Sequence, residues 1–586
     1  MAALDPVTLA LTQNRLDHIS RQMGWVMTRT ARSPIFSHSH DFSCFLTDAG
    51  GTLVSQADGI PIHTGGGGFA VRAVLRAFGE DIAQGDAFLL NDPYAAGGNH
   101  LPDWVIARPV FVEGRLVAFA NIRAHQSDIG GGAAGTYNPE ATEIWHEGIR
   151  LPALHLMRGE RIADDLWQLL MLNTRTPHLL DGDLRAMLGA TRIGGEQVAD
   201  LFAGLGLEQG QAYLDGLLAY ADRRLRAAIS ALPDGVYVGE DRFEDDCFEA
   251  MDIPIRATVT IAGDRMTVDF TGSHPQIRGF KNSSLANTTS GVYTAISSFF
   301  GADIPRNEGT FRGVTILAPE GSILNPRPPA PMTMNTIAPA CEIINAVWQA
   351  LGQADPARSC AGWGKPGAPI TSGTAPDGRT FVMYHWPAQS GGGAVDGRDG
   401  FPQQGGVNTL CGLVIPTVES YEQLYPVRIH RQELRCDTGG PGAFRGGPGV
   451  EYEVELLTPV QIAFRGEAYV SFGAFGANGG GAGAVGYNRL EPEGGEPVRP
   501  PAYGIRRTAG PARLRIWSAG GGGWGDPLDR DPARVLRDVR DGIVSREAAE
   551  RVYGVLLDEA GTAVDRAATE RLRLGARPSP AAPCSP

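Results

Sequence analysis

The chain has 586 residues, of which 42% are apolar and 20% charged, and it carries a formal net charge of −14. This composition is typical of a folded protein with a large core, not of a disordered chain. The acidic balance, without a basic stripe, disfavours nucleic-acid binding. No uncharged apolar run reaches the length of about 18 residues that a membrane-spanning helix requires, so we expect neither nucleic acid nor membrane as a partner.

The cysteines indicate a reducing compartment. There are seven of them, scattered and without a C-x-x-C motif: Cys44, Cys247, Cys341, Cys360, Cys411, Cys436 and Cys584. This pattern disfavours both a disulfide framework and a zinc ribbon. The N-terminus also lacks a basic segment followed by an apolar stretch. We therefore expect a cytoplasmic protein.

The first part of the chain mixes helices and strands. Asp5-Pro6 predicts the start of a helix that continues to about residue 32. Strand, turn and strand are expected over 42–54, a helix over 66–78, and strands over 86–91 and 104–120. We assign residues 1–158 to a mixed α/β region.

Helical periodicity dominates the next part, which we assign to a helical region over 159–235. A hairpin over 255–270 and helices over 291–300 and 340–351 predict an α+β region over 236–404. Short strands alternate with Gly-rich turns over 405–530, and C-terminal helices with a tail are expected over 531–586. The expected fold class is α+β: a large, β-rich, multi-lobed subunit with Gly-rich loops and a helical insertion.

Candidate metal ligands gather between residues 91 and 128. Two imidazoles and three carboxylates lie there: Asp92, His100, Asp103, His125 and Asp128. This ligand set suits Zn, Mn, Fe or Ni. A hairpin predicted over 111–119 would bring His125 back beside His100. A further carboxylate, Asp41, lies in the upstream segment His38-Ser39-His40-Asp41. The alternative is a hydrogen-bonded loop pair that only fixes the backbone.

Several catalytic motifs are missing from the sequence. There is no G-x-x-x-x-G-K-[ST] phosphate loop, no H-E-x-x-H and no G-x-S-x-G. A phosphate cradle of the Walker type and a serine nucleophile on a sharp strand-to-helix turn are therefore not supported.

The order and spacing of several segments resemble the hydantoinase B/oxoprolinase family over about residues 5–555. The matching segments are Arg32-Ser33, Asp41-Phe42-Ser43-Cys44, Asp92-Pro93-Tyr94, His100-Leu101-Pro102-Asp103, His125-Gln126-Ser127-Asp128-Ile129-Gly130-Gly131, Asp269-Phe270-Thr271-Gly272-Ser273, Ala318-Pro319-Glu320-Gly321-Ser322, Leu324-Asn325-Pro326, Gly439-Gly440-Pro441-Gly442, Arg445-Gly446-Gly447 and Gly521-Gly522-Gly523-Trp524-Gly525-Asp526-Pro527. Each motif is weak alone, and their order makes the resemblance specific.

The resemblance implies a divalent metal (Zn, Mn or Fe) held by His100, Asp103 and His125, with Asp41 as a further ligand or neighbour. It also implies that ATP and Mg bind a partner, an ATP-binding hydantoinase A-type subunit, in a hetero-oligomer. The family includes catalytic subunits of ATP-dependent N-methylhydantoinases and lactamases, half of 5-oxoprolinase, and the large subunits of acetone and acetophenone carboxylases.

The leading functional hypothesis is an ATP-dependent cyclic amidase that opens a hydantoin, lactam or oxoproline-like ring. Resonance makes a ring amide a poor electrophile, so phosphorylation of its oxygen would supply a leaving group. A metal would lower the pKa of a water, with Asp41 or Asp128 as the catalytic carboxylate. One alternative is an ATP-dependent ketone carboxylase subunit of the acetone or acetophenone type, although this chain is shorter than those large subunits. Another is a scaffold subunit with a structural metal.

Overall fold

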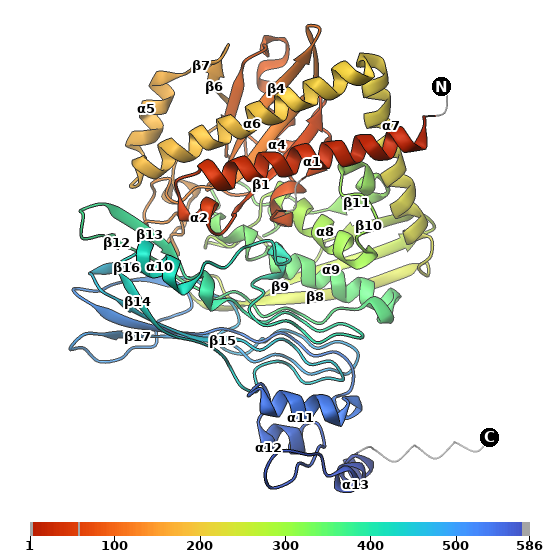
Figure 1. The fold of residues 1–586 in the computed structure, drawn as a ribbon, viewed down its shortest axis with the longest axis vertical. Helices are drawn as coiled ribbons and strands as arrows, with labels where there is room; N and C mark the ends of the chain where they lie inside the picture. The colour runs from red at the N-terminus through yellow and green to blue at the C-terminus, as the bar shows by residue number, and fades with distance from the viewer. Residues whose placement is uncertain (1–3, 57–58, 577–586) are drawn as a thin grey trace.

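The computed structural model describes residues 4–56 and 59–576 (Figure 1). Its N-terminal lobe is built on a seven-stranded sheet whose strand order is β2-β1-β5-β4-β3-β6-β7, with every neighbouring pair antiparallel. The strands are β1 (Phe42–Asp48), β2 (Leu53–Gln56), β3 (Ala87–Leu90), β4 (Asp103–Val112), β5 (Arg115–His125), β6 (Leu154–Arg158) and β7 (Arg161–Ile162). The last strand extends this sheet past residue 158, because β7 pairs with β6.

Helices cover both faces of this sheet. Successive strand residues point to opposite faces: Leu46 belongs to the core that includes α1 and α6, and Phe45 to the core that includes α4. The Asp5 carboxylate accepts a hydrogen bond of 2.8 Å from the amide of Thr8, which caps α1 as predicted. The helices of this lobe are α1 (Pro6–Thr30), α2 (Pro34–Ser37), α3 (Pro61–Thr64), α4 (Gly67–Phe78), α5 (Asp164–Leu172), α6 (Pro177–Leu205) and α7 (Leu207–Ile229).

A second sheet, of order β11-β10-β9-β8, lies below the first (Figure 1); helix α9 packs against its strands β8 and β9, and α8 packs against α9. Its elements are β8 (Gly235–Asp245), β9 (Ala250–Ala262), β10 (Arg265–Asp269), β11 (Val314–Leu317), α8 (Leu285–Phe300) and α9 (Ala340–Ala354). Helix α8 begins six residues before the predicted start at 291. Ser284 caps it, and the buried polar side chains of Asn287 and Thr288 donate to the carbonyls of Asn335 and Leu324. These contacts explain how a polar segment can form a buried helix turn.

The C-terminal lobe is a sandwich of two four-stranded sheets, β13-β12-β16-β18 and β14-β15-β19-β17. Their inward side chains share one core, which includes Ile462 from β16 and Leu514 from β19. The elements are β12 (Ile370–Thr374), β13 (Thr380–Tyr384), α10 (Val418–Leu424), β14 (Val427–Leu434), β15 (Val450–Leu456), β16 (Val460–Phe464), β17 (Tyr487–Pro492), β18 (Gly504–Arg507) and β19 (Ala512–Trp517). Two strands before residue 405 join this lobe because β12 pairs with both β13 and β16.

The glycine clusters of this lobe form closely packed segments that run side by side (Figure 1). The amide of Gly440 donates to the carbonyl of Gly521 at 2.7 Å, and that of Gly447 to Gly392 at 2.8 Å. A Cβ on Gly446 would lie 1.9 Å from the Gly521 oxygen, and none of these glycines has a positive φ. At these glycines the backbones approach each other closely, which only glycine allows.

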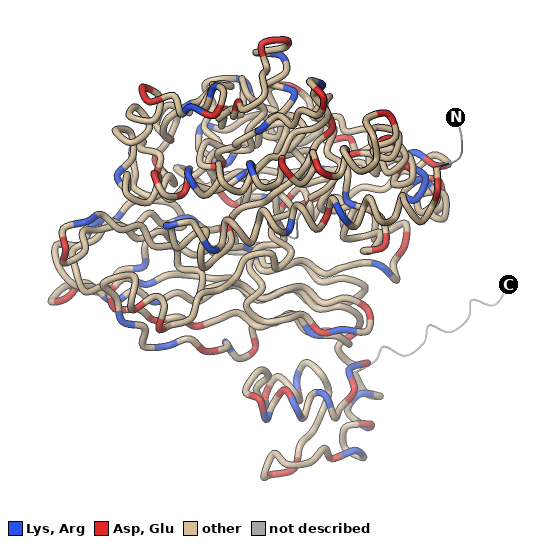
Figure 2. The backbone as a smooth tube through the Cα atoms, turned by 45° about the horizontal axis from the view of Figure 1, so that its top comes forward, with Lys and Arg blue, Asp and Glu red and all other residues tan. Residues whose placement is uncertain are grey.

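Three short helices end the described chain: α11 (Pro532–Arg540), α12 (Arg546–Arg551) and α13 (Arg566–Ala576). They protrude from the sandwich (Figure 1), and Arg530 connects them to it through Asp399 and Asp538. Residues 577–586, which include Cys584, lie outside the described residues. Figure 2 shows that basic and acidic residues are interspersed over the part of the chain that it colours. None of the described helices is both long and apolar enough to cross a bilayer.

Candidate metal centre

One end of the seven-stranded sheet brings the candidate ligands together. Asp103 opens β4 and His125 closes β5, and the two residues pair directly across the hairpin. Asp41 immediately precedes β1, and its carbonyl accepts a hydrogen bond of 3.1 Å from the amide of His125. The predicted hairpin therefore forms, and its register places these three residues at neighbouring strand ends.

His100, Asp103 and His125 form a compact and fully buried group. One ligand atom from each lies within 4.8 Å of the other two. Asp103 Oδ1 is 2.8 Å from His100 Nε2 and 3.2 Å from His125 Nδ1. Both imidazoles thus direct a nitrogen toward the same carboxylate oxygen.

The outer nitrogens of the two histidines have acceptors that fix the rings. His100 Nδ1 is 2.5 Å from the carbonyl oxygen of Thr333. His125 Nε2 is 3.1 Å from the hydroxyl oxygen of Tyr384, which itself donates to the carbonyl of Gly135 at 3.2 Å. When the ring protons sit on these outer nitrogens, His100 Nε2 and His125 Nδ1 face the carboxylate as lone pairs available to a cation, which is how metal-binding histidines are held.

The chemistry of this group fits a divalent cation. Asp103 is buried, and its Oδ2 has no hydrogen-bond partner among the described residues. A buried carboxylate oxygen without a donor is costly, and a cation near it would remove that cost. Two imidazoles and a carboxylate are ligands that Zn, Mn and Fe accept.

The electrostatics of the centre favour an ionised carboxylate. Burial opposes the charge of Asp103, but His100 and His63 offset this effect and lower the pKa of Asp103 well below its usual value. Burial lowers the pKa of His125, although hydrogen bonding to Asp103 opposes that shift. At neutral pH the group therefore offers an anionic oxygen and at least one neutral imidazole.

His63 also lies at the centre, although the sequence analysis did not identify it as a candidate site residue. It lies on α3, and its Nε2 is 3.6 Å from both Asp41 Oδ1 and Asp103 Oδ2. Burial lowers the pKa of His63 to about 4 and raises that of Asp41 to about 6. Asp41 faces His63 and a pocket, outside the compact group of three; its role as a further ligand stays a prediction.

Asp128 has a different environment. Its carboxylate accepts hydrogen bonds from the amides of Gly130, Gly135 and Arg175, and it forms an ion pair of 3.1 Å with the Arg175 guanidinium. These contacts fix the loop that carries Gly135, the acceptor for Tyr384. The structure does not bring Asp128 into the group of three ligand atoms, and its proposed catalytic role stays a prediction. Asp92 likewise pairs with Arg150, at 2.6 Å.

Comparison with known proteins identifies the family of the chain. The sequence profile described as Hydantoinase B/oxoprolinase matches residues 5–527. The chain belongs to this family. It is 37% identical over 588 residues to the caprolactamase beta chain of Pseudomonas jessenii, covering 98% of this chain and 100% of that protein. It is also 30% identical over 590 residues to the B-type component of a putative D-/L-hydantoinase from a Pseudomonas species, covering 97% and 98%.

Solved structures of related proteins share the fold of this hydantoinase B/oxoprolinase family member. The crystal structure of ATP-dependent caprolactamase from Pseudomonas jessenii matches with a TM-score of 0.88 and 35% identity, covering 98% of this chain and 100% of that one. A nucleotide-free structure of acetone carboxylase matches with a TM-score of 0.87 at 21% identity, covering 97% and 83%. At that identity the second likeness concerns the fold alone.

A pocket opens beside the centre at the junction of the N-terminal and C-terminal lobes. Asp41, His63 and His125 lie on its wall, together with Tyr137 and Arg465. Arg465 directly follows β16 and Tyr384 ends β13, so the C-terminal lobe completes a site that begins on the N-terminal sheet. Nothing local in the sequence marks Tyr137, Tyr384 or Arg465, because their role depends on contacts more than 200 residues away.

Proposed function

We propose that this chain is the metal-dependent catalytic subunit of an ATP-dependent complex that opens a cyclic amide, namely a hydantoin, lactam or oxoproline-like ring. The observation that carries the proposal is the buried group of His100, Asp103 and His125 beside a pocket. Identity of 37% to the caprolactamase beta chain along nearly the whole sequence supports the choice of a cyclic amide over a ketone.

The chemistry divides between activation of the ring and attack on it. A ring amide resists attack because resonance gives its C–N bond partial double-bond character. Phosphorylation of the amide oxygen, at the expense of ATP, would remove that resonance. A divalent metal at the centre supplies Lewis acidity and lowers the pKa of a water. Asp41 lines the pocket, and in this proposal it would orient the attacking water and accept its proton.

The proposed partner is an ATP-binding hydantoinase A-type subunit that also holds Mg. Two observations support it. The sequence contains no Walker-type phosphate loop, and two relatives are named as one subunit of a larger enzyme. We therefore propose a cytoplasmic hetero-oligomer in which the partner consumes ATP.

The test is ATP turnover by the purified complex against a panel of hydantoins, lactams and ketones, with and without bicarbonate. Phosphate release that depends on a cyclic amide, with a ring-opened product of mass increased by one water, is the expected result. ATP consumption only with a ketone and bicarbonate, giving a β-keto acid, would replace this function by ketone carboxylation.

A further inference from the structure

The pocket beside the metal centre contains a buried guanidinium that forms no ion pair with a described residue. Arg465 is 4% exposed and lines this pocket. Its Nε donates to the carbonyl of Ala368 at 3.3 Å, whereas its Nη1 is buried with no acceptor among the described residues. None of the carboxylates that the structure describes forms an ion pair with it, and Asp41, in the same pocket, attracts it only through a longer-range charge interaction.

Such an arrangement is unfavourable unless something compensates for it. A buried charge needs a counter-charge or a full set of hydrogen bonds. The Arg465 guanidinium carbon lies 3.9 Å from the centre of the Tyr137 ring, and this cation–π contact offsets part of the cost. It leaves the Nη1 hydrogens unmatched, because a ring face does not accept both of them.

Two other buried arginines make more contacts with the protein than Arg465 does. Arg530, 1% exposed, pairs with Asp399 and Asp538 at 2.6 Å each. Arg123, fully buried, donates to oxygens of His63, Asn99 and Gly66 through its two Nη atoms, and only its Nε has no acceptor among the described residues. Arg465 differs from both because its side chain makes a single hydrogen bond to the described residues, leaves an Nη donor unmatched, and lies on the wall of the pocket.

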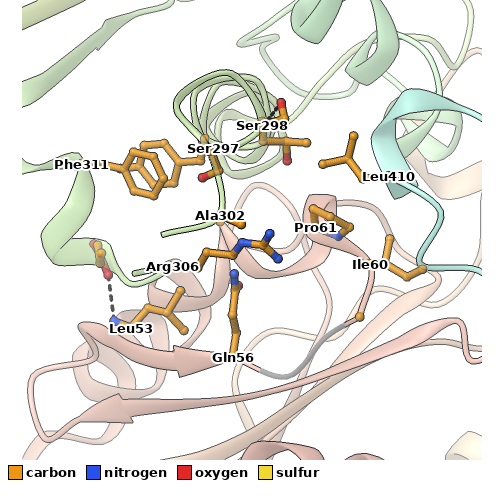
Figure 3. Close-up of a pocket in the computed structure, with 16 residues that line it drawn as sticks. Leu53, Gln56, Ile60, Pro61, Ser297, Ser298, Ala302, Arg306, Phe311 and Leu410 are labelled. Carbon is orange, nitrogen blue, oxygen red and sulfur yellow. Dashed lines mark hydrogen bonds between the residues drawn. The ribbon is translucent and has the colours of Figure 1, made fainter. Parts of the chain in front are cut away.

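A second cavity contains an exposed arginine, and comparison with it shows why only a buried guanidinium without an ion pair indicates a ligand. It has a volume of about 200 Å³, and Arg306 lines it beside Gln56 and Ser297 (Figure 3). Arg306 also lacks an ion pair within the described part of the chain, but its side chain is exposed. Water can hydrate that guanidinium, so its lack of a partner has little cost and does not indicate a ligand.

We propose that Arg465 binds an oxyanion of the reacting ligand in the pocket beside His125 and Asp41. The planar fork of a guanidinium matches phosphate and carboxylate oxygens, and a charge-assisted hydrogen bond is stronger in a buried site. The Gln389 and Asn408 side chains line the same pocket and offer amide groups. This assignment rests on the proposed function for its ligand: either the phosphoryl group of the activated amide or the carboxylate of the opened ring.

The position of Arg465 would make it a positioning and specificity residue. An oxyanion held there lies in the same pocket that His125 lines. The reacting carbon attached to that oxyanion would then face the metal centre. Neutral ligands would leave the Nη1 donor unmatched and bind less tightly, since an unpaired buried donor opposes their binding.

The experiment measures anion binding by the full-length, metal-loaded chain by calorimetry, without ATP or a partner. The probes are inorganic phosphate and butyrate. Arg465→Gln should weaken binding of at least one probe by about tenfold or more, because it removes a charge-assisted contact. Arg306→Gln is the matched control and should bind both probes as the unaltered chain does. If Arg465→Gln loses binding of phosphate alone, the ligand of Arg465 is the phosphoryl group. If it loses binding of butyrate alone, the ligand is the carboxylate of the opened ring.

Three outcomes would overturn the assignment: no binding of either probe at millimolar concentration, equal binding by Arg465→Gln, or loss in Arg306→Gln instead. If Arg465→Gln fails to fold, the same titration is made with Arg465→Lys. That variant keeps the positive charge but lacks the planar guanidinium, so it should still bind the probes more weakly. Metal content should not change in a folded variant. Because no ring opening is measured, an inactive complex would refute the proposed function and leave the anion site standing.

Discussion

Asp103 and His125 face each other at the open end of the β4–β5 hairpin, with Asp103 Oδ1 3.2 Å from His125 Nδ1. Side chains alternate between sheet faces, so a shift of one residue in this register would turn one of the two away from the other. The register of the hairpin therefore determines whether these two ligand atoms meet. His100 joins from the turn that leads into β4, held there by the Thr333 carbonyl.

The first prediction concerns metal binding. We expect about one divalent ion per chain, bound through His100, Asp103 and His125. A His100→Ala/His125→Ala double variant should lose it, because a single remaining carboxylate binds such ions weakly in water. Elemental analysis after dialysis measures the content.

The matched control for this double variant is His430→Ala. His430 is a partly exposed residue of β14 that pairs with Glu455 at 3.0 Å, and its loss should leave the metal content unchanged. Full metal content in a folded double variant would contradict the assignment.

The sequence predicted those parts of the centre that depend on short-range structure. Asp103 and His125 end the two strands of one hairpin and His100 lies in the turn just before it, so their proximity follows from strand periodicity and a turn. His63, Tyr384 and Arg465 could not be predicted in the same way, since each comes from a different element of the fold. A histidine, a tyrosine or an arginine in isolation has no distinguishing local pattern.

The same division holds for the fold. The N-cap at Asp5 and the β9–β10 hairpin have local signals, and both formed as predicted. The early start of α8 and the stacked glycine segments depend on distant carbonyl acceptors, such as those of Asn335 and Gly521. Propensity alone therefore favoured loops and turns at these places.

The second prediction concerns His63. A His63→Gln variant should bind the metal about 10- to 100-fold more weakly, because residues that orient a ligand contribute on that scale. His63 Nε2 lies 3.6 Å from Oδ2 of Asp103, and the other carboxylate oxygen of Asp103, Oδ1, faces both ligand histidines. Competition with a fluorescent chelator gives the affinity. His155→Gln, which disrupts a buried histidine–aspartate pair with Asp86 elsewhere, should retain full affinity; an equal loss in both variants would indicate a general effect of stability.

The third prediction concerns the anchor of the C-terminal helices. Arg530→Met should destabilise the packing of α11 by about 3 kcal/mol, because it leaves the buried Asp538 carboxylate with fewer partners. Hydrogen exchange should show faster opening over α11 and α12 than over β4 and β5. Uniform protection across the chain would show that Arg530 contributes little. Metal content serves as the internal control and should not change.

The fourth prediction concerns nucleotide binding. The isolated chain should neither bind ATP at micromolar concentration nor hydrolyse it, because its sequence has no Walker-type phosphate loop. The complex with its partner should do both. Calorimetry on the chain alone, followed by the same titration on the complex, separates the two cases. Micromolar affinity in the isolated chain would place the nucleotide site here and not on the partner.

The fifth prediction connects the centre to the reaction. An Asp103→Asn variant should assemble with its partner but lose ring opening of a hydantoin or lactam. The substitution keeps the size of the side chain and removes the charge that both His100 and His125 face. Size-exclusion chromatography reports assembly, and product formation by mass spectrometry reports the reaction.

Asp303→Asn, at an exposed aspartate that pairs with Arg224, is the control and should keep full activity. If Asp103→Asn assembles and still opens the ring at the original rate, the centre is structural and the reaction takes place elsewhere. If it assembles and loses the reaction while Asp303→Asn does not, the carboxylate that joins the two histidines is required for ring opening.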